Sequence, residues 1–349
     1  TDYEELQESA TGEYGGLGLR VGSERGMIKV IAPIDDSPAA KAGIEAGDFI
    51  VEVDGTPVRG MAVQKAIDKL RGEKGTSITL TVFREGEDGP LEITVIRDTI
   101  QVSSVRSRII EPGYGYVRVS QFQVSSGDDF KAALISLKTK EPALKGLIID
   151  LRNNPGGLVP ASVEIADAVL DGGTVVYTEG RLPGANISFD AEGGDLLEGT
   201  PIVVLINGGS ASASEIVAGA LQDHQRAAII GTQSFGKGSV QTVIPLGDGR
   251  AVKLTTARYF TPNGRSIQAE GIVPDIIVEP AEIRLYKKRK RVREADLEGH
   301  LEQADSKKKK AKDRDEDITD DNQLYEALNI LKGFQLLEKR VSSAPETQD

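Results

Sequence analysis

The 349-residue sequence contains no cysteine and no tryptophan, and its only histidines are His224 and His300. The lack of cysteine excludes disulfide bonds, thiol catalysis and thiolate metal ligands, and two histidines are too few for a histidine-rich metal cage. We therefore expect no metal and no cofactor. No run of eighteen apolar residues occurs, so the sequence predicts no membrane-spanning helix.

The charge is one-sided, with 42 lysines and arginines against 54 aspartates and glutamates and a formal net charge of −12. Nucleic acid and anionic membrane surfaces reward a basic face, so we expect neither as a main partner. The sequence begins at Thr1 without a start methionine, a charged segment or an apolar leader. We expect that any targeting segment has been removed or lies outside this sequence.

Residues 14–100 alternate short apolar strands with two helical stretches, and turn signals occur at Asp54-Gly55 and between Gly86 and Gly89. This spacing predicts a small antiparallel barrel with two helices. The order of elements resembles a PDZ domain. The resemblance implies a groove between residues 17–21 and the helix over 63–70, and a loop whose N–H groups bind a peptide carboxylate. The peptide-binding residues would be Gly15, Gly16, Leu17, Gly18 and Leu19. The alternative is that these glycines only form a tight turn.

The remaining chain divides by composition. Residues 101–280 alternate buried-looking apolar runs, such as Leu147-Ile148-Ile149, with helical spacing, which predicts an α/β core with a mainly parallel sheet. The PDZ-like domain either precedes this core or is inserted in it, and residues 1–13 are the end of an N-terminal region. Residues 281–349 form a charged linker and an amphipathic helix with apolar positions from Leu324 to Leu337, capped by Asp321. The helix packs on its own domain or on another subunit, and we favour the second, which predicts a homo-oligomer.

The segment from Ile202 to Gln222 runs from an apolar strand through a turn of small residues into a helix. A serine in such a turn lies at a helix N-terminus, where free N–H groups stabilise an oxyanion. Ser212 is the candidate nucleophile. The alternative is a capping box, in which Ser212 is the N-cap and Glu215 its partner.

A serine nucleophile needs a base. His224 lies about three helical turns beyond the serine and His300 lies in the charged tail, which argues against a Ser-His-Asp triad. Lys237 is flanked by glycines between two apolar strands, where burial lowers the pKa of a lysine toward that of a base.

Together, NGGSASASEIVAGALQD and FGKGSVQ resemble the C-terminal processing (tail-specific) serine protease family. The family nucleophile falls on Ser212 rather than Ser210 or Ser214, the base 25 positions later on Lys237, and an orienting glutamine on Gln241. The family's DLRxNxGG element is present as residues 150–157. The resemblance implies an oxyanion hole formed by the N–H groups of Gly157, chosen over Gly156, and Ala213. It extends over residues 1–280.

The family resemblance also implies a setting. It suggests the bacterial periplasm or an equivalent lumen, close to a membrane without crossing it, and an adaptor protein as a possible partner. Arg84 is a candidate for coupling the PDZ domain to the core, with a plain surface arginine as the alternative.

The function predicted is a PDZ-gated serine endopeptidase that recognises protein substrates through their C-termini. One alternative is a PDZ-based binding scaffold whose protease-like domain is catalytically silent. Another is a Ser-Lys amidase or esterase acting on small molecules, for which a peptide-binding domain would have little use.

Overall fold

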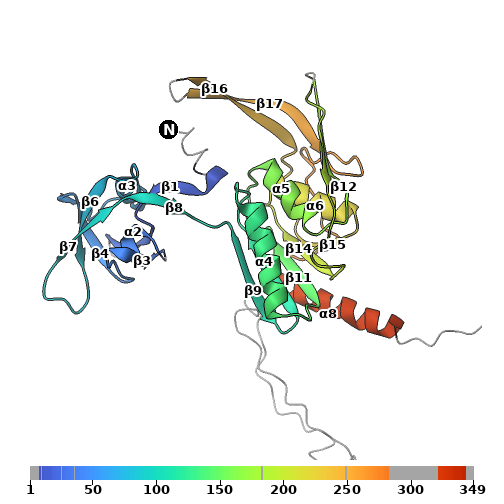
Figure 1. Cartoon of the computed structure of the whole chain (residues 1–349), viewed down its shortest axis with the longest axis horizontal. Coiled ribbons are helices and arrows are strands. Elements are labelled where there is room, and N and C mark those ends of the chain that lie inside the picture. The colour runs from blue at the N-terminus through green and yellow to red at the C-terminus, as the bar shows by residue number, and fades with distance from the viewer. Residues whose placement is uncertain are drawn as a thin grey trace, which may run out of the picture. The chain divides into compact units, whose positions relative to one another are not determined.

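A computed structural model describes residues 8, 10–24, 26–34, 36–181, 184–247, 250–282 and 321–342 (Figure 1). The chain divides into two compact units, Thr1–Ser103 and Ser104–Asp349. Each unit has a hydrophobic core of its own.

The first unit is a twisted antiparallel sheet closed by helices. Its strands follow the order β2-β3-β4-β6-β7, with β5 on β4, while β1 pairs with β8. Alternate side chains of the SITLTVF strand, Ile78, Leu80 and Val82, are buried, as one face of a pleated sheet requires. The elements are β1 (Glu13–Gly16), β2 (Leu19–Glu24), β3 (Met27–Pro33), α2 (Pro38–Lys41), β4 (Phe49–Val53), β5 (Thr56–Pro57), α3 (Val63–Leu70), β6 (Ser77–Phe83), β7 (Leu91–Ile96) and β8 (Asp98–Gln101).

The second unit contains a six-stranded sheet in the order β18-β15-β14-β11-β10-β9. All its neighbouring strands are parallel except β9, which is antiparallel to β10. Every residue of β11 and β14 is buried, because helices cover both faces. The strands are β9 (Val105–Glu111), β10 (Tyr114–Val119), β11 (Gly146–Asp150), β14 (Ile202–Ile206), β15 (Ala227–Gly231) and β18 (Ile276–Ile277).

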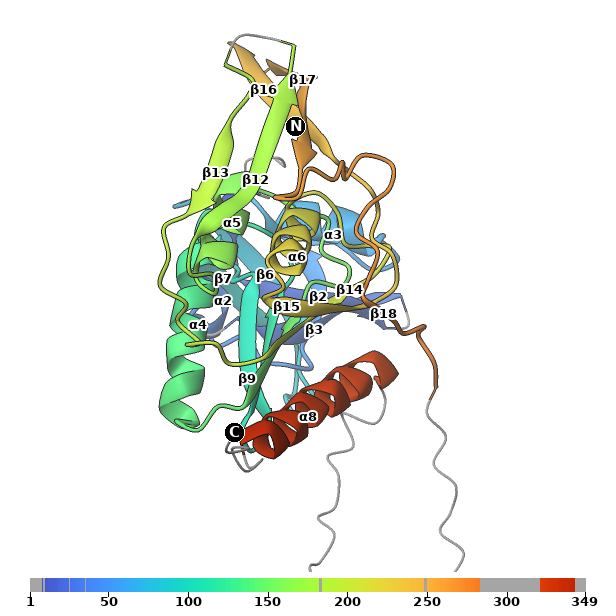
Figure 2. The same ribbon diagram turned by 90° about the vertical axis from the view of Figure 1, so that its right-hand side faces the viewer.

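The two faces of this sheet have different partners. One face packs against α4 (Ser126–Lys140), α5 (Val159–Asp167) and α6 (Ala213–Asp223). The other face packs against α8 (Asn322–Ser342), drawn in red in Figure 2. Successive side chains of β14 point to opposite faces of the sheet. Val204 packs in the core on the side of α4, α5 and α6, whereas Val203 and Leu205 pack in the core on the side of α8.

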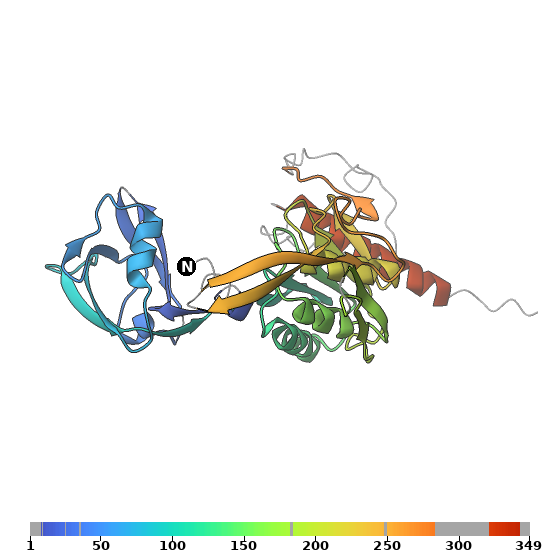
Figure 3. The ribbon, with the colours of Figure 1, turned by 90° about the horizontal axis from the view of Figure 1, so that it is seen from above.

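A second, wholly antiparallel sheet of four strands was not foreseen. It follows the order β13-β12-β17-β16, with β12 (Gly173–Gly180), β13 (Ser188–Ala191), β16 (Ser239–Gly247) and β17 (Arg250–Phe260). β16 and β17 form a long two-stranded ribbon that extends beyond the rest of their unit (Figure 3). The core therefore has mixed sheets, a six-stranded one that is parallel except at β9 and a four-stranded antiparallel one. The ribbon has polar and exposed positions along β17, so it lacks the apolar run that marks a buried strand.

Helix α8 packs on its own unit. Its start is capped as expected, because Asp321 Oδ1 accepts the N–H of Leu324 at 3.0 Å. Leu324, Leu328 and Leu331 are buried against the sheet, together with Ile148 and Val203 among others. The preference for another subunit as the partner of this apolar face was therefore wrong, because the sheet supplies a complementary apolar face within the chain. Residues 283–320, which hold most of the charged linker, lie outside the described residues.

No helix in the described part of the chain is both long and apolar enough to span a membrane.

Candidate active site

Three serines lie in the turn between β14 and α6, and two of them have structural partners. The buried Ser210 hydroxyl donates to the carbonyl of Leu151 at 2.8 Å, and the buried Ser214 hydroxyl donates to that of Asn154 at 2.9 Å. Ser212 is partly exposed. Of the three serines, Ser212 is thus the one that is not buried.

Ser212 has an unusual backbone conformation, with φ 56° and ψ −112° at the N-cap of α6. A residue with a Cβ atom rarely adopts a positive φ, and such strain concentrates at functional turns between a strand and a helix. The helix N-terminus adds free N–H groups and a favourable dipole for an anion.

The carboxylate of Glu215 holds this turn to the loop that carries Lys237. Glu215 is fully buried. Its Oε2 accepts the N–H of Ser212 at 2.7 Å and that of Lys237 at 2.9 Å. Its Oε1 accepts the N–H of Gly236 and the hydroxyl of Ser234, both at 2.6 Å. Sequence reasoning assigned Glu215 only to a capping box, which accounts for one of these four bonds.

Lys237 is half-buried in the loop between β15 and β16. Its ammonium makes no ion pair or hydrogen bond to any group in the described ranges. Gln241 lies four residues later on β16, opposite Thr255, and is exposed. His224 ends α6, and its Nε2 lies 2.7 Å from the carbonyl oxygen of Thr174, so it takes no part in the turn around Ser212.

Two consecutive glycines bring the turn after β11 against the nucleophile turn. A Cβ atom on Gly156 would lie 2.8 Å from the Cβ of Ser212 and 3.1 Å from the nitrogen of Ala213. The N–H of Gly156 is already used, since it donates to Asn154 Oδ1 at 2.9 Å. Gly157 is exposed, whereas Ala213 is fully buried. Neither the N–H of Gly157 nor that of Ala213 has a hydrogen-bond partner among the described residues.

Asp150 and Arg152 form a structural network beside this turn. The fully buried Asp150 accepts hydrogen bonds from Arg152 and from the Tyr116 hydroxyl, the latter at 2.8 Å. Arg152 Nη2 also lies 2.6 Å from Asp321 Oδ2, just before α8. Burial opposes the charge of Arg152, but the hydrogen bonds that it donates to both aspartates raise its pKa above the ordinary value. Asp150 and Arg152 are therefore structural partners.

A groove of about 400 Å³ lies between β2 and α3 of the first unit. The glycine loop contributes to its lining, and Leu17 within that loop is buried. The groove follows the position expected from the sequence. It is lined by Tyr14, Gly16, Leu17, Gly18, Leu19, Arg20, Val21, Ile31, Ile67, Leu70 and Arg71.

Arg84 is engaged within the first unit. Its guanidinium bonds to the buried Asp48 through Nε at 2.8 Å, to Glu45 at 3.0 Å and to the carbonyl of Gly43 at 2.7 Å. Burial raises the pKa of Asp48, but the bonds from Arg84 and from the N–H of Glu45 outweigh it and hold the pKa below its ordinary value.

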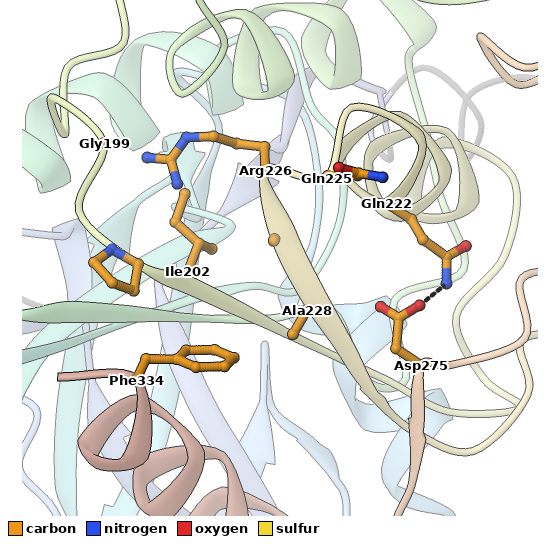
Figure 4. Close-up of a pocket in the computed structure, with 10 residues that line it drawn as sticks. Gly199, Ile202, Gln222, Gln225, Arg226, Ala228, Asp275 and Phe334 are labelled. Carbon is orange, nitrogen blue, oxygen red and sulfur yellow. Dashed lines mark hydrogen bonds between the residues drawn. The ribbon is translucent and has the colours of Figure 1, made fainter. Parts of the chain in front are cut away.

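A second pocket, of about 500 Å³, lies at the opposite end of the parallel sheet, where β14 and β15 begin. Figure 4 shows Phe334 of α8 and Ile202 of β14 among the lining residues, and Gln222 joined to Asp275 by a hydrogen bond, which is 2.8 Å long. This pocket is separate from Ser212, which follows the other end of β14.

No group of three or more histidine, aspartate or glutamate side chains suited to holding a metal ion occurs in the part of the chain that the structure covers.

Each of the two units matches a known protein family. Residues 113–278 match peptidase family S41, and residues 29–84 match the PDZ domain. The carboxy-terminal-processing protease of Bartonella bacilliformis is 50% identical over 335 residues, which are 94% of this chain and 77% of that protein. The carboxyl-terminal-processing protease of a Synechocystis species is 40% identical over 283 residues, 79% of this chain and 65% of the relative.

A solved structure supports the fold. The putative S41 protease from Bacteroides fragilis covers 93% of this chain and 84% of its own, with a TM-score of 0.53 and 16% sequence identity. The chain is therefore a serine-type peptidase with a PDZ domain. It belongs to the carboxy-terminal-processing proteases of peptidase family S41, as the resemblance in its sequence indicated.

Proposed function

We propose that the protein cuts peptide bonds with Ser212 as the nucleophile and Lys237 as the general base. The observation that carries this proposal is the shared carboxylate of Glu215, which binds the backbone N–H groups of both residues. The partial exposure of Ser212, in contrast to the buried and bonded Ser210 and Ser214, supports the choice of nucleophile.

The reaction proceeds through an acyl-enzyme. Neutral Lys237 takes the proton of the Ser212 hydroxyl as Oγ attacks the scissile carbonyl carbon, and it returns the proton to the leaving amine. A water molecule then attacks the ester carbonyl, and Ser212 recovers its proton through Lys237. Gln241, as a neutral amide, is the candidate to orient the lysine amine by a hydrogen bond.

The tetrahedral oxyanion would be held by the N–H groups of Gly157 and Ala213. Gly157 is the better candidate than Gly156, because the N–H of Gly156 already donates to Asn154. A Cβ atom on Gly156 would lie 3.1 Å from the nitrogen of Ala213, and Ala213 is buried. Use of the Ala213 donor therefore requires the double-glycine turn to shift, and glycines permit such a change at low cost.

The PDZ groove would capture the C-terminus of a protein substrate and raise its effective concentration at the protease unit. Its aliphatic wall, which includes Ile67 and Leu70, suits an apolar last side chain. If Arg84 couples the PDZ domain to the protease unit, its guanidinium must release the exposed Glu45 and bind a group of the protease unit instead. The ion pair with the buried Asp48 would remain in place. We also propose that the protein is located in the periplasm or an equivalent lumen, close to a membrane. It would act there as a homo-oligomer, with an adaptor protein as a partner.

The test compares the wild type with Ser212→Ala and Lys237→Ala on casein, following fragments by mass spectrometry over a pH series. Both variants should lose at least about 10³-fold in rate, and wild-type cleavage should rise toward alkaline pH, as general-base catalysis predicts. Ser188→Ala and Lys253→Ala, exposed positions on β13 and β17, are matched controls that should retain full activity. Cleavage by Ser212→Ala would exclude this nucleophile. An inert wild type that still binds C-terminal peptides would favour the binding-scaffold alternative.

A further inference from the structure

The charged side chains that line the PDZ groove are all positive. Its lining contains Arg20 and Arg71 and no aspartate or glutamate, although the whole chain carries a formal charge of −12. The rest of the lining is mostly aliphatic. A groove with apolar walls and two cationic side chains suits an apolar peptide whose end is an anion.

Arg71 is held beside the glycine loop by several contacts. It is the C-cap of α3, where its N–H donates to the carbonyl of Ile67 at 3.0 Å. The next residue, Gly72, donates its N–H to the carbonyl of Gly15 at 3.1 Å, which ties the end of α3 to the loop. The guanidinium carbon lies 5.0 Å from the centre of the Tyr14 ring. Stacking on an aromatic ring reduces the freedom of an arginine side chain before any ligand arrives.

The guanidinium has one carboxylate partner, and one of its other donors is buried without a partner among the described residues. Nη1 of Arg71 lies 2.7 Å from Oε2 of Glu8, a residue of the same chain. Its Nε is buried and has no hydrogen-bond partner among the described residues. A buried donor without a partner is costly, and a guanidinium binds a carboxylate best through two parallel N–H bonds.

We propose that Arg71 is the charged anchor for the C-terminal carboxylate of the captured peptide, and that Glu8 occupies this anchor when no peptide is bound. This inference rests on the proposed function, since it assumes that the groove binds substrate C-termini. The bound peptide would place its carboxylate between the loop N–H groups and Arg71, and its last side chain against Ile67 and Leu70. Lysine or arginine as the last residue would be disfavoured by the positive charge of Arg20 and Arg71.

The test measures peptide binding with Ser212→Ala as the background, so that no cleavage occurs. A fluorescent peptide ending in apolar residues is titrated as the free acid and as the C-terminal amide. Arg71→Gln should weaken binding of the acid about tenfold and leave binding of the amide unchanged, because a hydrogen bond to a charged group is lost only with the acid. Arg71→Lys keeps the positive charge but cannot form two parallel N–H bonds to a carboxylate. Its affinity for the acid should therefore lie between those of the background protein and of Arg71→Gln.

Two further variants separate the anchor from a general charge effect. Arg59→Gln removes the same charge from an exposed position outside the groove and should leave the affinity unchanged. Glu8→Gln should strengthen binding of the acid about threefold, because it removes a competing surface ion pair. Combined with Arg71→Gln, the same change should leave the affinity for the acid unaltered.

The outcomes distinguish the inference from the proposal beneath it. If the acid binds and Arg71→Gln lowers acid and amide binding equally, or not at all, the anchor is refuted while peptide capture stands. If neither peptide binds to the background protein at any concentration tested, peptide capture by the groove is refuted, and the anchor with it. Thermal unfolding of each variant checks that the first unit remains folded.

Discussion

The backbone nitrogens of Ser212 and Lys237 donate hydrogen bonds to the same atom, Oε2 of Glu215, at 2.7 and 2.9 Å. The two residues are 25 positions apart in the sequence. A capping box needs only the bond to Ser212, whereas Gly236 and Ser234 add two more donors from the loop of Lys237. The carboxylate therefore fixes the separation of the two backbone segments that carry the proposed nucleophile and base.

Glu215→Gln should lower kcat at least about 30-fold and change KM less than twofold. The amide replaces one accepting oxygen by a donor that faces N–H groups, so the two loops separate while the PDZ groove is untouched. Steady-state kinetics on a peptide substrate measures both constants. Asp195→Asn is the matched control, because Asp195 is also a buried carboxylate but bonds Arg226 at the far end of the sheet. It should lower the melting temperature and leave kcat unchanged. Equal losses of kcat in both variants would mean that Glu215 acts through stability alone.

Ser212→Gly should abolish cleavage and stabilise the protein by about 1 kcal/mol. Glycine adopts φ 56° and ψ −112° without the strain that any Cβ atom imposes. Urea unfolding of the protease unit gives the free energy of unfolding. Ser212→Ala, which keeps the Cβ atom, should be inactive without this gain, and a gain in both variants would show that the hydroxyl rather than the backbone is the source of strain.

Asp321→Asn should destabilise the second unit by about 1 kcal/mol at pH 7, a figure already reduced for the partial exposure of the side chain, and by less at pH 3. Burial raises the pKa of Asp321, but the bonds from Arg152 and from the N–H of Leu324 outweigh burial and lower it below its usual 3.8. A carboxyl group with a lowered pKa in the folded state contributes stability above its unfolded pKa, and that stability disappears as pH falls through the folded value. Asparagine still caps α8, so the difference isolates the charge. Chemical unfolding at the two pH values measures it, and an equal loss at both would contradict an electrostatic origin.

Leu328→Ala should cost about 2 to 4 kcal/mol of stability, because the side chain is 1% exposed between α8 and the sheet. Leu337→Ala on the same helix, where the side chain is 59% exposed, should cost less than about 0.5 kcal/mol. Denaturant unfolding compares the two. Similar small costs would indicate that α8 does not pack on its own unit in solution.

The sequence by itself determined the features that depend on neighbouring residues. The apolar runs at 147–149 and 202–206 predicted buried strands, the glycine loop and the 63–70 helix predicted the groove, and Asp321 predicted the helix cap. Motifs in chain order identified the protease family. The roles of Ser212 and Lys237 stay predictions, supported by where their backbones lie.

Only the tertiary structure decided the relationships between distant segments. From the sequence, Glu215 is recognisable only as part of a capping box, and the tertiary structure adds its bond to the loop of Lys237. Likewise, Arg71 is recognisable only as a residue at the end of a helix, and the tertiary structure adds its contacts with Glu8 and Tyr14. The partner of α8 and the antiparallel pairing of β16 and β17 are likewise invisible in local pattern. Periodicity tells which face of an element is apolar, because it reflects the geometry of that element alone. It does not tell which surface covers that face, because that choice is made by the packing of the whole chain.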